Sequence, residues 1–308
     1  MRPGHGDQVL SWAWAGVAVL LILATLLSAL FHRLRPSRET LKTRLRVRTW
    51  WVIAGCLFAA MMFGRFGLAS LFCLVSLVAL QEFVTLDPGM PRRETVRLIL
   101  GIGTVAVYAL MARPCPPPPA WPVWSLLVSM LGTGLVAATG SVSRGMVSLA
   151  AFMLGACGLA CVVGIAHGGS HRPAPAAGIR LVFLLLALTA LNDVAQYLWG
   201  KSLGRRAVVP RVSPGKTWAG LLGGVSTTSL LAAGIAPCFT VERWPWGLLI
   251  GLLIGFGGFA GDILASAYKR RVGVGESGTL LPGHGGLIDR IDSLCVTAPL
   301  LYGVLSIF

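Results

Sequence analysis

Long apolar segments recur along the whole length of this chain of 308 residues, and they limit its fold more than any other feature. Each segment is about 20 residues long, the length that an α-helix needs to cross a bilayer, whereas apolar runs in buried strands reach only about 4–8 residues. Only 12% of the residues are charged, and the mean hydropathy is +0.77, while a soluble protein carries about a quarter charged residues. The sequence therefore predicts an all-α polytopic membrane protein.

The apolar pattern predicts about ten transmembrane helices joined by short polar connections. The expected spans are 9–31, 49–64, 66–86, 98–112, 122–139, 146–166, 179–199, 218–238, 245–268 and 294–308. The first span is too long for the apolar part of a secretory signal, so we expect it to be retained as a helix.

Positive charge is concentrated in five of the predicted connections. Loops 32–48, 87–97, 140–145, 200–217 and 269–293 hold 20 of the 26 Lys and Arg residues of a chain whose net charge is +15. The positive-inside rule places these loops in the cytoplasm and both termini on the other side. A nucleic-acid partner is not expected, because it would need basic residues gathered on one folded face. Anionic membrane lipids explain the charge better.

The most basic connection, Arg33–Arg48, can be interpreted in two ways. It could form an amphipathic segment on anionic lipid, or it could serve only to orient the neighbouring spans. We favour the second interpretation, since the positive-inside bias requires no further role.

Carboxylates gather toward the C-terminal end of the chain. Six of the eleven acidic residues, Glu242 among them, are scattered through tails and loops. The other five all lie in about the last 120 residues: Asp193, Asp262, Glu276, Asp289 and Asp292. Two of them, Asp193 and Asp262, fall inside predicted spans, where an unpaired carboxylate costs several kcal/mol. Oxygen ligands without accompanying His or Cys clusters suit Mg²⁺ better than zinc. The pattern predicts a shared acidic cavity that faces the cytoplasm.

Two basic motifs accompany these carboxylates. Ser213–Thr217 (SPGKT) combines a Gly turn, a hydroxyl, a lysine and the start of a helix, which is typical of a phosphate cradle, although it lacks the glycine spacing of a Walker A motif. Further on, Asp262, Ser266 and Lys269 follow an i, i+4, i+7 spacing and so share one helix face. Acid, hydroxyl and base together suit a metal–polyphosphate complex.

These motifs resemble the C-terminal signature of the phosphatidate cytidylyltransferase (CDP-diacylglycerol synthase) family. That signature is Ser-x-x-Lys-Arg followed by Pro-x-His-Gly-Gly-x-x-Asp-Arg-x-Asp, and it matches Ser266–Arg270 and Pro282–Asp292. The family's upstream Ser-Pro-x-Lys-Thr matches Ser213–Thr217, and its preceding helical Asp matches Asp193. The resemblance covers about the last 120 residues.

The resemblance implies a transfer of CMP from CTP to phosphatidate, supported by Mg²⁺ with room for a second cation, in a protein that forms homodimers. It implies catalytic roles for Lys269, His284, Asp289, Arg290 and Asp292. The residues implied to bind substrate or phosphate are Asp193, Ser213, Lys216, Thr217, Ser266, Arg270, Gly285 and Gly286. Those implied to hold the metal are Asp262, Asp289 and Asp292.

The chain then divides into an N-terminal transmembrane bundle, residues 1–178, and a C-terminal catalytic transmembrane region, residues 179–308. The catalytic region contains the cytoplasmic loops 200–217 and 269–293, and the expected location is a bacterial plasma membrane with the active site toward the cytoplasm.

The chain departs from the family pattern at one charged position. The family has a Lys-Asp pair where this chain has Gly275–Glu276, so one cation is missing. Two alternatives therefore stay open: another lipid phosphate, such as a polyprenyl phosphate, as the acceptor, or a catalytically impaired relative. A transporter is disfavoured, because its charges should lie near mid-membrane in both halves of a repeat.

Overall fold

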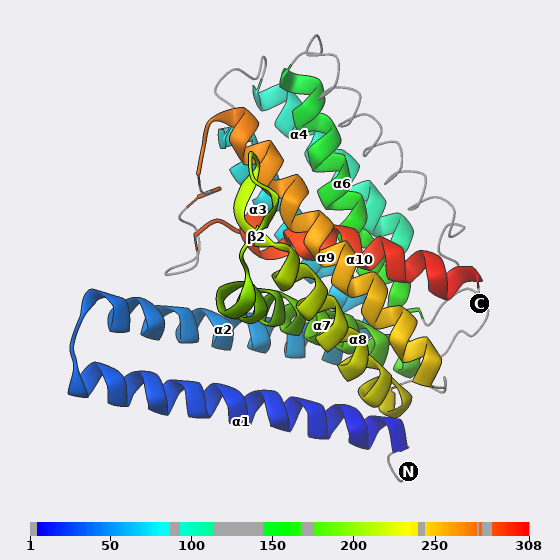
Figure 1. Ribbon diagram of the computed structural model, residues 1–308. Helices are drawn as coiled ribbons and strands as arrows, with labels where there is room; N and C mark the ends of the chain where they lie inside the picture. Colours follow the sequence, from blue (N-terminus) through cyan, green and yellow to red (C-terminus); the bar gives the residue numbers. More distant parts are fainter. Residues whose placement is uncertain are drawn as a thin grey trace.

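The computed structural model describes residues 5–86, 93–113, 144–167, 175–239, 244–275, 277–278 and 285–307, most of which are helical (Figure 1). The helices of the N-terminal half are α1 (His5–Leu34), α2 (Arg38–Met62), α3 (Gly64–Leu86), α4 (Arg93–Met111) and α6 (Arg144–Ile165). The C-terminal half contains α7 (Pro175–Leu203), strands β1 (Ala207–Val209) and β2 (Ser213–Thr217), α8 (Trp218–Phe239), α9 (Trp244–Val272) and α10 (Ile288–Ile307).

Six helices in the described part of the chain are long and apolar enough to cross a membrane, namely α1, α2, α3, α7, α8 and α9. The prediction of an all-α membrane protein is therefore confirmed. The number of ten spans stays a prediction, since span 122–139 lies outside the described residues.

The basic segment Arg33–Arg48 is not the connecting loop that we expected. It is helical except at residues 35–37, where α1 gives way to α2. Ser37 begins α2 with a reciprocal cap, because its hydroxyl accepts from the Thr40 amide at 3.2 Å and its own amide donates to the Thr40 hydroxyl at 3.0 Å. The basic residues from Arg38 to Arg48 thus form the first turns of α2. Helix α2 lies beside α1 along one edge of the molecule (Figure 1).

One face of α9 packs closely on α8 through glycines spaced four residues apart. Gly247, Gly251 and Gly255 form this face, and a Cβ on Gly255 would lie only 3.0 Å from the Cα of Val225. Small residues at this spacing let two membrane helices approach until their backbones touch.

A second glycine face of α9 meets α10. A Cβ on Gly261 would lie 2.9 Å from the Cα of Ser293 and would overlap the carbonyl oxygen of Asp292. On its other side α10 packs against α6, where a Cβ on Gly164 would lie 2.6 Å from the ring of Tyr302. Residues 293–299 of α10 are consequently buried, which makes α10 a core helix.

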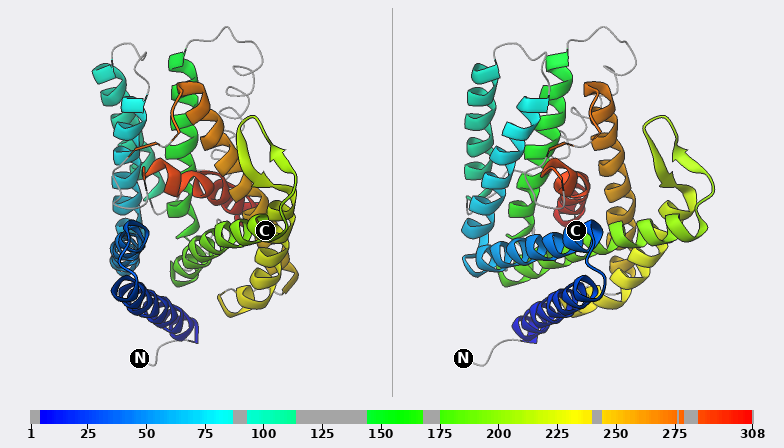
Figure 2. Two further views of the ribbon diagram at one scale, coloured as in Figure 1. Left: turned by 60° about the vertical axis from the view of Figure 1, so that its left-hand side comes forward. Right: turned by 90° about the vertical axis from the view of Figure 1, so that its left-hand side faces the viewer.

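The hydrophobic core is continuous across the two halves of the chain. One buried cluster contains residues from all described helices except α1, among them Leu68 of α3, Leu159 of α6, Leu185 of α7 and Ile254 of α9. The views in Figure 2 show α4, α6 and α9 side by side, while the β1–β2 hairpin projects from the helices. The polar motifs are thus attached to a core to which both halves of the chain contribute.

The close packing of α9 on α8 predicts that a glycine-to-alanine change lowers thermal stability inside the contact but not outside it. Gly251→Ala should lower the thermal unfolding temperature in detergent, because its Cβ would overlap the Cα of Ser229 and overpacking costs about 1–3 kcal/mol. Gly234→Ala on α8 is the matched control, since its Cβ meets no atom within 4 Å. The control should unfold at the same or a higher temperature, because alanine favours a helix by about 1 kcal/mol over glycine. A lower unfolding temperature for both variants would contradict the proposed close packing.

Candidate active site

A short hairpin carries the first functional lysine to the carboxylates of the helical core. Strands β1 and β2 pair antiparallel, and β2 leads directly into α8. Thr217 ends the strand and caps the helix, because its hydroxyl accepts from the amide of Gly220 at 3.1 Å. Arg270 ties the hairpin to α9 by donating to the carbonyl of Val212 at 3.4 Å. These two contacts hold the backbone of β2 at Lys216, the residue before Thr217.

Lys216 forms an ion pair with Asp262 of α9. Both side chains are largely buried, with 28% of Lys216 and 15% of Asp262 exposed, so the pair is shielded from water. The ammonium group also lies 6.0 Å from the ring centre of Phe259, on the same helix. The ion pair thus joins the hairpin lysine to an aspartate of the apolar helix α9.

Two carboxylates meet at the hydroxyl of Ser293, and a third lies beside them. The Ser293 Oγ lies 3.3 Å from Asp193 of α7 and 3.2 Å from Asp262 of α9, and also 3.3 Å from the carbonyl of Gly258. One hydroxyl proton can serve only one of these acceptors at a time. Asp292 lies beside Asp262 and close to Asp193, and one of its oxygens accepts from the Ser293 amide at 2.9 Å. The close approach of α9 and α10 therefore gathers three carboxyl groups at one point.

A second ion pair lies further along α9. Lys269 donates to Asp289 at 2.5 Å, and the other oxygen of Asp289 accepts from the amide of Ser277 at 3.2 Å and from its hydroxyl at 2.8 Å. Burial alone would raise the pKa of the Asp289 carboxyl, but the bonds from Lys269 and Ser277 outweigh it and lower the pKa below its usual value. Asp289 is thus held as a carboxylate.

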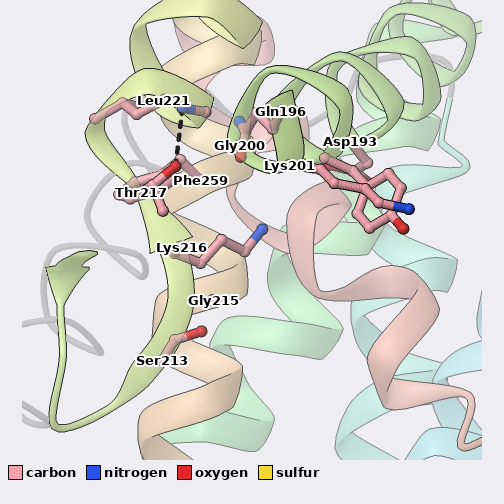
Figure 3. A pocket seen from close by; sticks show the side chains of 12 residues that line it. Asp193, Gln196, Gly200, Lys201, Ser213, Gly215, Lys216, Thr217, Leu221 and Phe259 are labelled. Carbon is pink, nitrogen blue, oxygen red and sulfur yellow. Dashed lines mark hydrogen bonds between the residues drawn. The ribbon is translucent and has the colours of Figure 1, made fainter. Parts of the chain in front are cut away.

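A cavity of about 360 Å³ opens beside the first ion pair, between α7, β2, α8 and α9 (Figure 3). Its polar lining includes Asp193, Lys201, Ser213 and Lys216. Figure 3 shows the Lys216 side chain extending from β2 into the cavity, opposite the α7 residues. The cavity therefore offers two cations and a carboxylate to one ligand.

The structure brings most of the sequence-predicted residues together, in two neighbouring groups. Asp193, Lys216, Asp262 and Asp292 form one, and Lys269 and Asp289 form the other. Ser266 lies half-buried on α9 between them, and the exposed Arg290 is near enough to Asp193 for its charge to act on that carboxylate. Gly285 has a positive φ of 85°, and Gly286 packs where a Cβ would overlap the Ser277 hydroxyl. His284 and Glu276 lie outside the described residues.

Sequence reasoning missed four residues that contact these groups. Ser293 and Ser277 bridge or bind the carboxylates, and Tyr197 and Gln196 line the cavity. Ser293 gave no signal, because an isolated serine beside an apolar run resembles many others. Gln196 was visible as a polar residue inside a predicted span, three residues after Asp193, and could have been included.

The donor set is chemically suited to Mg²⁺. In the described part of the chain, no three His, Cys, Asp or Glu side chains are arranged as ligands of one ion. Mg²⁺, however, is usually held by one or two carboxylates together with substrate phosphates and water. Asp262 and Asp292, with Asp193 beside them, supply such carboxylates next to the cavity.

The chain is similar to known proteins over most of its length. The model of the cytidylyltransferase family matches residues 44–308. An uncharacterized protein of Escherichia coli (strain K12), YnbB, is 41% identical over 298 residues, which are 94% of this chain and 95% of that protein.

Enzymes named phosphatidate cytidylyltransferase match over a shorter stretch. The one from Brucella melitensis is 38% identical over 135 residues, which are 42% of this chain and 48% of that enzyme. The one from Bacillus subtilis (strain 168) is 38% identical over 136 residues, covering 42% of this chain and 49% of that enzyme. The match thus spans about half the length of these enzymes.

The buried ion pair on α9 predicts a non-additive effect on stability. Lys269→Met should lower the free energy of unfolding by about 1–3 kcal/mol, because it leaves the Asp289 charge buried with Ser277 as its remaining partner among the described residues. The double change Lys269→Met with Asp289→Asn should recover part of that loss, since no uncompensated charge remains. Thermal unfolding in detergent measures both, and a double variant that is less stable by the sum of the single losses would contradict the pairing.

Proposed function

The chain belongs to the cytidylyltransferase family, and from this premise we propose that it transfers CMP from CTP to a lipid phosphate, with phosphatidate as the first candidate acceptor. The products would be CDP-diacylglycerol and pyrophosphate. The observation that carries the proposal is the Lys216–Asp262 pair at the edge of a cavity that also presents Lys201 and Asp193. This arrangement provides cations for a triphosphate and carboxylates for the metal that accompanies it.

The reaction requires little covalent chemistry from the protein. A phosphate monoester is already an anionic nucleophile near neutral pH, so one of its oxygens can form the new bond to the α-phosphorus of CTP. The bond between the α-phosphorus and the oxygen that bridges to the β-phosphorus breaks, and pyrophosphate leaves with that electron pair. The protein has to hold two polyanions in line and to neutralise the leaving group.

The basic residues have distinct places in this proposal. Lys216 and Lys201 reach the cavity and would bind the triphosphate there. Lys269 and Arg270, at the end of α9, and Arg290, in the first turn of α10, would neutralise the acceptor phosphate or the leaving pyrophosphate. Because Lys216 is paired with Asp262 in the structure, a phosphate would exchange for that carboxylate as its partner.

Asp262 and Asp292 would hold Mg²⁺, with Asp193 beside them. When bound, the ion would supply positive charge against the phosphate oxygens. Asp289, which the family resemblance also assigned to the metal, is bound by Lys269 and Ser277, so its first role would be to fix the lysine.

The lipid acceptor would approach from the side of α7 and α8. Tyr197 lines the cavity and is 64% exposed, and Trp218 at the start of α8 is also exposed. An apolar outer surface beside a charged cavity would let acyl chains stay in the bilayer while the phosphate enters the site. A polyprenyl phosphate would meet the same requirements, so it is the second candidate acceptor.

The location and assembly belong to the same proposal. The asymmetry of Lys and Arg supports an active site on the cytoplasmic side of a bacterial plasma membrane, and it supports ten spans with both termini outside. The family resemblance supports a homodimer.

A direct assay tests the proposed reaction. Purified protein in detergent is incubated with CTP, Mg²⁺ and phosphatidate, and CDP-lipid and pyrophosphate are measured. Asp289→Asn should lower turnover by about 100-fold or more, because Lys269 loses its charged partner in the site. Glu39→Gln is the matched control, since Glu39 is exposed and pairs only with the neighbouring Lys42 among described residues.

The acceptor panel separates the alternatives. Product from polyprenyl phosphate but not from phosphatidate would replace the first acceptor by the second. An absence of product from every lipid phosphate, with folded protein, would contradict the proposed activity and leave a catalytically impaired relative.

The missing cation of the family pattern can be restored. Gly275 is exposed, its φ lies outside the left-handed region, and a Cβ would meet no atom within 4 Å, so a longer side chain fits there. Gly275→Lys should raise kcat by about fivefold, since one charge-assisted hydrogen bond at an exposed site contributes on the order of 1 kcal/mol. Gly275→Met controls for the added stem, and an equal or lower rate in Gly275→Lys would discard the missing cation as the limit on turnover.

A further inference from the structure

Glu82 of α3 reaches from the N-terminal half of the chain to the start of α10. Its Oε2 accepts a hydrogen bond from the backbone amide of Ile288 at 3.0 Å, across 206 positions of sequence. Ile288 is the first residue of α10, so its amide has no acceptor within the helix. Glu82 therefore caps a helix to which it is not connected in sequence.

The second carboxylate oxygen of Glu82 is enclosed by backbone. Oε1 is buried and has no hydrogen-bond partner among the described residues. A Cβ on Gly278 or on Gly286 would overlap this oxygen, so both positions leave room for it only because they are glycines. A buried carboxylate oxygen without a partner costs free energy, and a side chain that merely packed there would be better apolar.

The backbone that encloses Glu82 also holds the second ion pair of the site. Ser277, next to Gly278, binds Asp289 through its amide and its hydroxyl. Asp289 follows Ile288 in α10 and pairs with Lys269. One carboxylate thus contacts the segments on both sides of the catalytic pair.

We propose that Glu82 is a positioning residue, which fixes the first turn of α10 and the Ser277–Gly278 backbone so that Asp289 and Lys269 keep their places in the site. The neighbouring α3 residue Phe83 stacks on Tyr268, next to Lys269, through an apolar contact. Glu82 adds a polar link from the same helix to the first turn of α10. The functional consequence rests on the proposed cytidylyltransferase activity, whereas the structural link does not.

Two changes at Glu82 separate the effect of side-chain length from the effect of charge, since one keeps the length and the other keeps the charge. Glu82→Gln keeps the length and an oxygen acceptor for the Ile288 amide, and Glu82→Asp keeps the charge but is one methylene shorter. Glu82→Ala removes the cap entirely. We expect kcat to fall about 10- to 100-fold in Glu82→Ala and Glu82→Asp, with KM for CTP changed less than about threefold, and kcat to be largely retained in Glu82→Gln.

Hydrogen exchange provides a measurement that does not depend on turnover. The amide of Ile288 should exchange faster in Glu82→Ala than in the unaltered protein, while amides in the middle of α10 keep their protection. If the unaltered protein shows no turnover with any acceptor, the proposed function fails but the exchange result still decides the role of Glu82. If Glu82→Ala cannot be purified, Glu82→Asp takes its place in this comparison.

The control is Glu94→Ala, which removes a carboxylate that is 81% exposed on α4 and pairs with Arg97. It should leave both exchange and kcat unchanged. Unchanged exchange at Ile288 in Glu82→Ala would overturn the proposal, and so would a Glu82→Gln variant as impaired as Glu82→Ala, because the acceptor alone is then insufficient.

Discussion

The close approach of α9 to its two neighbours is the constraint on which the site depends. Glycines on one face of α9 admit the backbone of α8, and Gly261 on another face admits the backbone of α10 at Asp292 and Ser293. A Cβ at these positions would overlap the neighbouring backbone, so α9 would have to move away from α8 and α10. Asp262, the residue after Gly261, would then lose its contact with the Ser293 hydroxyl, and the carboxylates would no longer share one point.

This packing explains how the protein tolerates so many charges within apolar helices. The carboxylates on α9 and α10 are each met by a cation or a donor: Lys216 at Asp262, Lys269 and Ser277 at Asp289, and the Ser293 amide at Asp292. Such pairs offset the cost of burial only when their geometry is held. The hairpin cap at Thr217 holds one lysine in place, and the remote cap by Glu82 holds the helix that carries the second pair.

The sequence was sufficient for what depends on local pattern. Spacing placed Asp262 and Lys269 on one helix face, and composition identified a helical membrane protein; both follow from periodicity and charge. Long-range contacts could not be read in this way. Glu82 looked like one of several scattered acids, because its partner lies 206 positions away, and Ser293 looked like an ordinary core serine. The basic segment Arg33–Arg48 is helical where its charge predicts a loop, because the cap at Ser37 starts a new helix within it.

If the carboxylates beside α9 hold a metal-bound nucleotide, the affinity of the protein for CTP should depend on a divalent ion, which equilibrium binding measures. Mn²⁺ replaces Mg²⁺, and CTP binding by the purified protein is measured with and without the ion, in the unaltered protein and in Asp292→Asn. We expect Mn²⁺ to strengthen CTP binding in the unaltered protein and Asp292→Asn to remove about 10-fold or more of this gain. An equal gain in both proteins would contradict this expectation.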